Sequence, residues 1–245
     1  MSAAAAAVSG FADEATATVA LAWSLAGSDG GMIVREGETL AADAAIEGDG
    51  DATRLTLRAE GVECEADLKP QPGLLPLPAT QVEIGLGEPS AAACAVRATI
   101  RDGAERRLDC EGHVTRWASD PTEGVSVFRF LAFPGPDRSL LVAAAARPDG
   151  AETHGDEGVA AWQLDPEGEA SAFGEALLST QYDGDGVQVR TGLELWRPQP
   201  DAPPLRAAGR LLHGTVVELG PVTTAALHTS AEGSEGIGGY LIWRR

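Results

Sequence analysis

Hydrophobic and polar residues alternate along much of the chain, and this pattern predicts β-strands. Between residues 62 and 68, four apolar residues alternate with three acidic ones. Residues 96–100 alternate in the same way. Such alternation places one face of a strand in a core and the other face in water. Beyond the first residues, no window of a dozen positions repeats apolar residues at helical spacing, so we expect an all-β protein.

The second half of the chain has a different pattern. Residues 125–133 and 140–146 are nearly continuous apolar runs, which predicts strands covered on both faces and a more enclosed interior. A polar, turn-forming segment at 118–124 separates this half from the first. We therefore expect a disordered leader over residues 1–15, an N-terminal barrel-like half over 16–118 and a C-terminal barrel-like half over 124–245.

Charge limits the partners of the protein. The chain has 18 Lys and Arg residues against 37 Asp and Glu residues, a formal charge of −19. Its average surface therefore repels phosphate groups, which argues against nucleic acids and anionic membranes as partners. No apolar stretch approaches the ~20 residues that cross a bilayer, and the first residues lack the features of a secretory signal. We expect a cytoplasmic protein, and a homodimer is left open.

Motifs for metal, cofactor or nucleophile chemistry are missing from the sequence. Cys64, Cys94 and Cys110 fall at apolar positions of predicted strands, which favours buried, reduced thiols. There is no glycine-rich phosphate loop, no cysteine pair with zinc spacing and no Gly-x-Ser-x-Gly segment. The sequence therefore predicts no metal and no cofactor.

Two histidines are candidate proton carriers. His154, Asp156 and Glu157 lie in a short polar segment, where an imidazole and two carboxylates could act as an acid–base pair or bind a metal. An exposed acidic loop is the alternative for that segment. His113, near the end of the N-terminal half, is the second candidate, and the alternative is a hydrogen-bonded structural histidine.

Arg129 is the most informative single residue. It shares a strand face with Val127 and Leu131, so if that face points into a barrel, its charge must meet either a carboxylate or a ligand. Aromatic residues could wall an apolar pocket, although any β-core also uses them. The candidates are Trp117, Trp162, Tyr182 and Trp196.

Short segments along the chain carry a family resemblance. They are Gly112-His113 followed by Trp117, Phe128-Arg129-Phe130, and residues 151–155, 192–196 and 235–238. This series resembles the tandem lipocalin-like superfamily of AttH-like and carotenoid hydratase-like (hydroxyneurosporene synthase-like) proteins. The resemblance implies two consecutive lipocalin-like β-barrels or curled antiparallel sheets packed together. It also implies relatives that bind isoprenoid, polyketide or other apolar metabolites and sometimes hydrate or cyclise them.

These observations lead to two functional hypotheses. In the first, the protein binds a small apolar metabolite in a β-barrel cavity of the second half and hydrates or cyclises it by acid–base catalysis. His113, His154 and Asp156 would then be catalytic, while Arg129 and the four aromatic residues bind the ligand. In the second, the protein is a non-catalytic ligand-binding or structural lipocalin-like protein. The resemblance implies a His-Ser-Trp-Gly core before the junction of the two halves, where this chain has Thr115-Arg116-Trp117-Ala118. This difference favours the second hypothesis.

Overall fold

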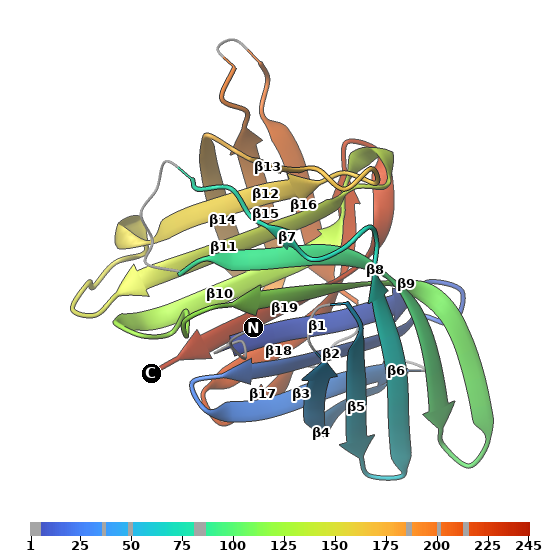
Figure 1. Cartoon of the computed structure of the whole chain (residues 1–245). Helices are drawn as coiled ribbons and strands as arrows, with labels where there is room; N and C mark the ends of the chain where they lie inside the picture. The colour runs from blue at the N-terminus through green and yellow to red at the C-terminus, as the bar shows by residue number, and fades with distance from the viewer. Residues whose placement is uncertain are drawn as a thin grey trace. The chain divides into compact units, whose positions relative to one another are not determined.

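β-Strands make up most of the computed structural model, which describes residues 6–35, 38–48, 51–80, 87–184, 188–199, 202–212 and 216–245. Strands pair antiparallel throughout these residues (Figure 1). The expected all-β class is confirmed. In the same residues, no helix is long and apolar enough to cross a membrane.

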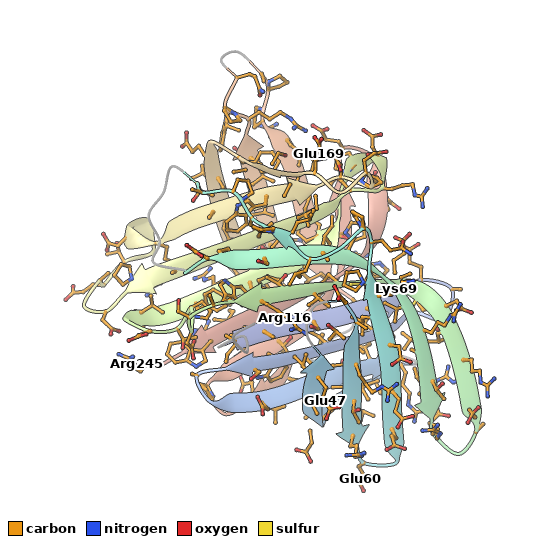
Figure 2. All side chains as sticks on the ribbon, viewed as in Figure 1. Glu47, Glu60, Lys69, Arg116, Glu169 and Arg245 are labelled. Atoms are coloured by element: carbon orange, nitrogen blue, oxygen red, sulfur yellow. The ribbon has the colours of Figure 1, made fainter. Side chains whose placement is uncertain are left out.

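The chain divides into two units. One comprises Met1–Pro76 with Gly87–Pro121, and the other comprises Leu77–Leu86 with Thr122–Arg245. The main division therefore lies inside the polar segment 118–124. Charged side chains cover the solvent side of the strands and turns, as Glu47, Glu60 and Glu169 illustrate (Figure 2).

The first unit is a closed barrel of eight strands. Its strand order is β6-β5-β4-β3-β2-β1-β9-β8, and β8 pairs again with β6 to close the sheet. An eight-stranded barrel is just wide enough for side chains to fill it, and Leu55, Leu57 and Ile100 are fully buried there. The strands are β1 (Ala6–Asp13), β2 (Thr18–Leu25), β3 (Ser28–Arg35), β4 (Glu38–Gly48), β5 (Thr53–Ala59), β6 (Val62–Pro70), β8 (Pro89–Arg101) and β9 (Glu105–Trp117), with the short β7 (Leu75–Pro76) beside β8.

The first strand of the barrel corrects the expected leader. Residues 6–13, which the sequence pattern assigned to a disordered segment, form β1 between β2 and β9. Residues 6–11 are buried on both faces, so apolar residues and glycine occupy all of these positions except Ser9, and no polar alternation appears. Gly10 shows how tight this packing is, because a Cβ atom there would lie 2.7 Å from the carbonyl oxygen of Ala20. Residues 1–5 lie outside the described part of the chain.

The three cysteines are free thiols. Cys64 and Cys94 are buried, as expected, whereas Cys110 is half-buried. Burial raises the pKa of each thiol to about 12. The thiols are therefore protonated at neutral pH, and a protonated thiol is a poor nucleophile.

The second unit is an open, strongly curled sheet. Its strand order is β13-β12-β11-β10-β19-β18-β16-β15-β14, and β17 pairs with β18. Its elements are β10 (Val125–Pro134), η1 (Pro136–Arg138), β11 (Leu140–Pro148), η2 (His154–Asp156), β12 (Gly158–Leu164), β13 (Ala170–Ala172), β14 (Glu175–Tyr182), β15 (Gln188–Trp196), β16 (Leu205–Leu211), β17 (Val217–Leu219), β18 (Val222–Ala231) and β19 (Ser234–Arg244).

The expectation that the second half is the more enclosed one is wrong. The first unit closes, and the second stays open. The apolar runs in β10 and β11 do reflect burial of both strand faces, as expected. A strand can be buried on both faces, however, without the two edge strands of its sheet pairing to close a barrel.

Candidate functional site

One face of the second sheet carries the core cluster of that unit, and we call it the inner face. Leu131 on β10, Leu193 on β15 and Leu227 on β18 contribute to this cluster, so the inner face lies inside the curl. Arg129 lies two residues after Val127 and two residues before Leu131 on β10. Because every second residue of a strand points to the same face, Arg129 lies on the inner face with them. A guanidinium group is therefore buried among apolar side chains.

Arg129 is held by a carboxylate and a hydroxyl. The Nη2 atom of Arg129 donates to Glu157 Oε1 at 3.1 Å, and its Nη1 atom donates to Thr180 Oγ1 at 2.9 Å. Arg147 reaches the same Glu157 oxygen through Nη2 at 2.5 Å and through Nε at 3.2 Å. We call these four residues the arginine–glutamate cluster. The sequence left open whether Arg129 meets a carboxylate or a ligand, and the structure shows the carboxylate.

The cluster concentrates charge away from water. The side chains of Arg129, Arg147 and Glu157 are 3%, 16% and 7% exposed. Two guanidinium groups thus share one carboxylate on the inner face. Such an arrangement fixes the positions of the side chains strongly, because removing one partner would leave an uncompensated buried charge.

Tyr240 places a phenol beside this cluster. It lies opposite Leu131 in the β10–β19 pair and is 1% exposed. Burial raises its pKa above the ordinary value, while the nearby Arg129 guanidinium and the Thr180 hydroxyl lower it in part. Among the described residues, no group makes a hydrogen bond of ordinary geometry with its hydroxyl. Tyr240 is therefore a neutral, buried hydrogen-bond donor.

Gln188 adds a second buried polar group. It lies opposite Tyr182 in the β14–β15 pair, next to a β-bulge between Gln181 and Tyr182. The side chain of Gln188 is 4% exposed, and neither its amide nitrogen nor its amide oxygen has a hydrogen-bond partner in the described structure. Tyr182 itself accepts a long hydrogen bond, 3.5 Å, from Arg244 Nη2.

The structure brings together only two of the predicted ligand-binding residues of this unit. Arg129 and Tyr182 both lie on the inner face and both affect the pKa of Tyr240. Trp162 directly follows the core residue Ala161, and Trp196 directly follows the core residue Leu195. Adjacent residues of a strand point to opposite faces, so both tryptophans lie on the face opposite the inner one. The indole Nε1 of Trp162 donates to the carbonyl oxygen of Pro78 at 2.8 Å.

His113 and Trp117 lie in the first unit, on one face of β9. The opposite face of that strand carries Val114, which packs inside the barrel. His113 is 6% exposed, and burial lowers its pKa to about 4. The imidazole is therefore neutral near pH 7.

Asp156 lies in the exposed segment around η2. Its carboxylate accepts hydrogen bonds from the Thr153 amide at 3.2 Å and from the Thr153 hydroxyl at 2.8 Å, and these bonds lower its pKa. The side chain of His154 lies outside what the structure describes. Among the described residues, no group of three or more His, Cys, Asp and Glu side chains is placed to hold a metal ion.

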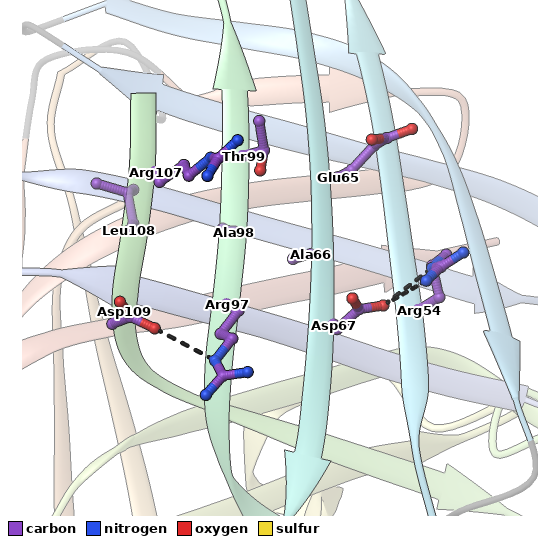
Figure 3. Close-up of a pocket in the computed structure, with 10 residues that line it drawn as sticks. All are labelled: Arg54, Glu65, Ala66, Asp67, Arg97, Ala98, Thr99, Arg107, Leu108 and Asp109. Atoms are coloured by element: carbon purple, nitrogen blue, oxygen red, sulfur yellow. Dashed lines mark hydrogen bonds and ion pairs between the residues drawn. The ribbon is translucent and has the colours of Figure 1, made fainter. Parts of the chain in front are cut away.

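The outer wall of the first barrel contains an open hollow of about 530 Å³ (Figure 3). Four of its charged residues pair with one another across the strands. The N···O distances are 2.9 Å for Arg54–Asp67 and 3.6 Å for Arg97–Asp109, and all four side chains are more than half exposed. Solvated charges that neutralise one another make this hollow a weaker candidate than the inner face of the second sheet.

Four residues of the inner-face site were missed from the sequence: Arg147, Thr180, Tyr240 and Gln188. Glu157 was predicted only as an acid–base or metal-binding carboxylate beside His154 and Asp156, and its burial with Arg129 was not foreseen. Glu157 directly follows Asp156, and nothing in the residue pattern distinguishes the buried carboxylate from its exposed neighbour. For Arg147 a signal exists, because it ends an apolar run as Arg129 interrupts one. Tyr240 and Gln188 show no signal beyond their place in predicted strands.

Comparison with known proteins identifies relatives by structure alone. No family model and no curated protein matches the sequence. An AttH-like protein from Nitrosomonas europaea is 12% identical with a TM-score of 0.71, and the match covers 98% of this chain and 92% of that one. Kievitone hydratase from Nectria haematococca is 9% identical with a TM-score of 0.68, covering 98% and 89%. CghA, in a complex with Sch210972, is 14% identical with a TM-score of 0.61, covering 97% and 88%.

At identities this low, structural similarity establishes the fold and leaves the activity open. The matches nevertheless span almost the whole chain and include both units. The resemblance to tandem lipocalin-like proteins is therefore confirmed at the level of architecture. The chain has the two-unit lipocalin-like fold of the AttH-like protein and kievitone hydratase.

Proposed function

We propose that the protein binds a small, largely apolar molecule on the inner face of its second sheet and holds a polar group of that molecule at Arg129 and Tyr240. The observation that carries this proposal is the buried hydroxyl of Tyr240 beside the arginine–glutamate cluster. Its contact with the Thr180 hydroxyl falls short of ordinary hydrogen-bond geometry, and a buried polar group that is poorly paired costs up to roughly 1–3 kcal/mol. A ligand oxygen that accepts a hydrogen bond from the phenol would remove that cost.

The surroundings of the cluster fit such a ligand. Leu131, Phe133 and Leu227 supply apolar surface on the same face. Small-molecule sites typically combine mostly apolar walls with a few fixed polar groups. Arg129 is fixed by Glu157 and Thr180, so little side-chain entropy would be lost when a ligand binds there.

Hydration or cyclisation of the bound molecule is the catalytic form of this proposal. Tyr240 would donate a hydrogen bond to a carbonyl oxygen of the ligand and stabilise the negative charge that develops there when water, or a nucleophile within the ligand, adds to a conjugated double bond. The proton released by the nucleophile ends on the α-carbon of the ligand, so the phenol keeps its own proton. The exposed Asp156 and the neutral His113 give less support for catalysis than Tyr240 does. The match to a hydratase and to a protein complexed with a small molecule supports ligand chemistry on this fold.

Binding without catalysis is the second candidate. Glu157, the carboxylate of the cluster, accepts hydrogen bonds from two guanidinium groups. Charge-assisted hydrogen bonds of this kind hold the three side chains in fixed positions. A carrier needs the cluster for orientation only, and this contact is consistent with that role.

Calorimetric titration of the parent protein and two variants tests the proposal. The ligands are isoprenoid and polyketide-like compounds, each with and without a terminal carboxylate. We expect Arg129→Met to weaken binding of the carboxylates by about 1.5–3 kcal/mol and Tyr240→Phe to weaken it by about 1 kcal/mol. Conversion of a bound compound, followed by mass spectrometry, separates an enzyme from a carrier.

A matched control comes from the first unit. Arg35 pairs with the largely buried Asp102, so Arg35→Met makes the same chemical change away from the inner face. It should alter stability and leave ligand affinity as in the parent. Absence of binding throughout the panel, or equal affinity in the parent and both inner-face variants, would contradict the proposal.

A further inference from the structure

The amide of Gln188 offers a donor and an acceptor side by side, and the described structure uses neither. Glutamine is mostly exposed in folded proteins, yet Gln188 is 4% exposed. Among the described residues, neither polar atom of this amide has a hydrogen-bond partner, whichever of the two is nitrogen and whichever is oxygen.

A neighbour on the same strand shows that the environment can satisfy polar groups. Thr191 is also buried on the inner-facing side of β15, and its hydroxyl donates to the carbonyl oxygen of Ser179 at 3.2 Å. Gln188 lies three residues earlier, where the β-bulge locally disrupts the strand pair. The unpaired amide is therefore a local feature of this end of the sheet.

Gln188 belongs to the same polar region as Tyr240. It faces Tyr182 across the β14–β15 pair, and the Tyr182 phenol is close enough to Tyr240 to affect its pKa. A molecule held at Arg129 and Tyr240 could thus present a second polar group to Gln188. This step rests on the proposed function.

We propose that Gln188 binds a lactam or carboxamide group of the ligand. A cis amide carries a carbonyl acceptor and an N–H donor on one edge, which complements the donor and acceptor of the glutamine amide. A lactone or a ketone could use only the Nε2 donor, and an N-methyl lactam would lose its own donor. The site should therefore prefer compounds with a free amide N–H.

Three probes that differ at one group test this preference. They are a δ-lactam with a long alkyl substituent, its N-methyl derivative and the matching δ-lactone. We expect the parent protein to bind the lactam about tenfold more tightly than either of the others, which corresponds to one lost hydrogen bond. In Gln188→Met, a substitution of similar volume, the three probes should bind equally.

The ligand-free stability of the variants excludes a merely structural role. Gln188→Met removes two unpaired buried groups, so its unfolding midpoint should equal or exceed that of the parent. Thr191→Val is the matched control. It removes a hydroxyl that has a partner, and it should lower the midpoint while keeping the lactam preference.

Two results would overturn the inference. One is a Gln188→Met variant that is less stable than the parent and still prefers the lactam. The other is a parent protein that binds the three probes equally, or binds none of them. If the parent at the same time binds carboxylates in a manner that depends on Arg129 and Tyr240, only the role of Gln188 fails. If no compound binds, the proposed function fails with it.

Discussion

Most ion pairs of the first unit are exposed to solvent, whereas the second unit has a cluster buried on the inner face of its sheet. In the first unit, the barrel core is apolar apart from Asp102, directly after β8, which Arg35 and Arg106 share, and charged residues alternate in sign across the outer wall. One such row runs through Glu47, Arg54, Asp67, Arg97 and Asp109. In the second unit, an ion-paired cluster lies on the inner face. The closed sheet has an interior filled by side chains, whereas the open sheet accommodates fixed polar groups.

This difference has energetic consequences. Exposed ion pairs typically contribute less than 1 kcal/mol, because water solvates the separated charges almost as well as the partner does. Removing one member of a buried pair is far more costly, since the other charge stays in a poorly solvated place. The same chemical change should therefore have very different effects in the two units.

The largest expected effect is at Glu157. Glu157→Gln leaves Arg129 and Arg147 without their shared carboxylate, and we expect a loss of about 3–5 kcal/mol in the free energy of unfolding. Urea denaturation monitored by circular dichroism measures it. Asp156→Asn, one residue earlier but exposed, is the matched control and should have a much smaller effect. A loss at Glu157 no larger than that of the control would mean that the cluster is solvated.

The second-largest expected effect is a loss of stability at low pH that depends on His113. Burial lowers its folded-state pKa to about 4, below the ordinary value of 6.5, so the unfolded chain binds a proton that the folded chain does not. The contribution to stability is complete above about pH 6.5 and is lost as the pH falls toward 4. The loss amounts to roughly 3 kcal/mol. This part of the acid sensitivity should disappear in His113→Leu.

Denaturant unfolding at pH 7 and at pH 4.5 tests the His113 prediction. The parent should lose more stability between the two values than His113→Leu does. Replacement of the exposed His228 in the second unit is the control. Equal pH dependence in the parent and His113→Leu would show that the imidazole gains a proton without cost in the folded state, and the first unit would then tolerate buried charge as the second does.

The sequence predicted the fold correctly where strands have one solvent-exposed face and one buried face. Residues 62–68 alternate because one side of β6 lines the barrel and the other meets water. The β1 strand was missed because it is buried on both sides and has no polar alternation to reveal it. For the same reason, the apolar runs of β10 and β11 revealed burial and gave no information on closure.

The site was only partly predictable for a related reason. Arg129 stood out because a charge in an apolar strand needs a partner. Its partner Glu157 lies 28 positions away, and the pairing depends on how β10, β11 and β12 align, which local patterns do not reveal. Trp162 and Trp196 were assigned to the pocket on residue type, but strand alternation places them on the opposite face from Arg129.

The smallest expected effect is on the outer wall of the first barrel. Asp109 and Arg97 are 86% and 90% exposed at an N···O distance of 3.6 Å, so Asp109→Asn makes the same acid-to-amide change as Glu157→Gln where water solvates both charges. We expect the free energy of unfolding to stay within about 0.5 kcal/mol of the parent at 0.15 M salt. Losing the ion pair is offset because one negative charge is removed from a chain of net charge −19, which reduces self-repulsion. Both contributions are screened by salt, so the difference should approach zero at 1 M NaCl. A loss above 2 kcal/mol, or one that persists in high salt, would show that the outer rows hold the barrel together as the buried cluster holds the second sheet.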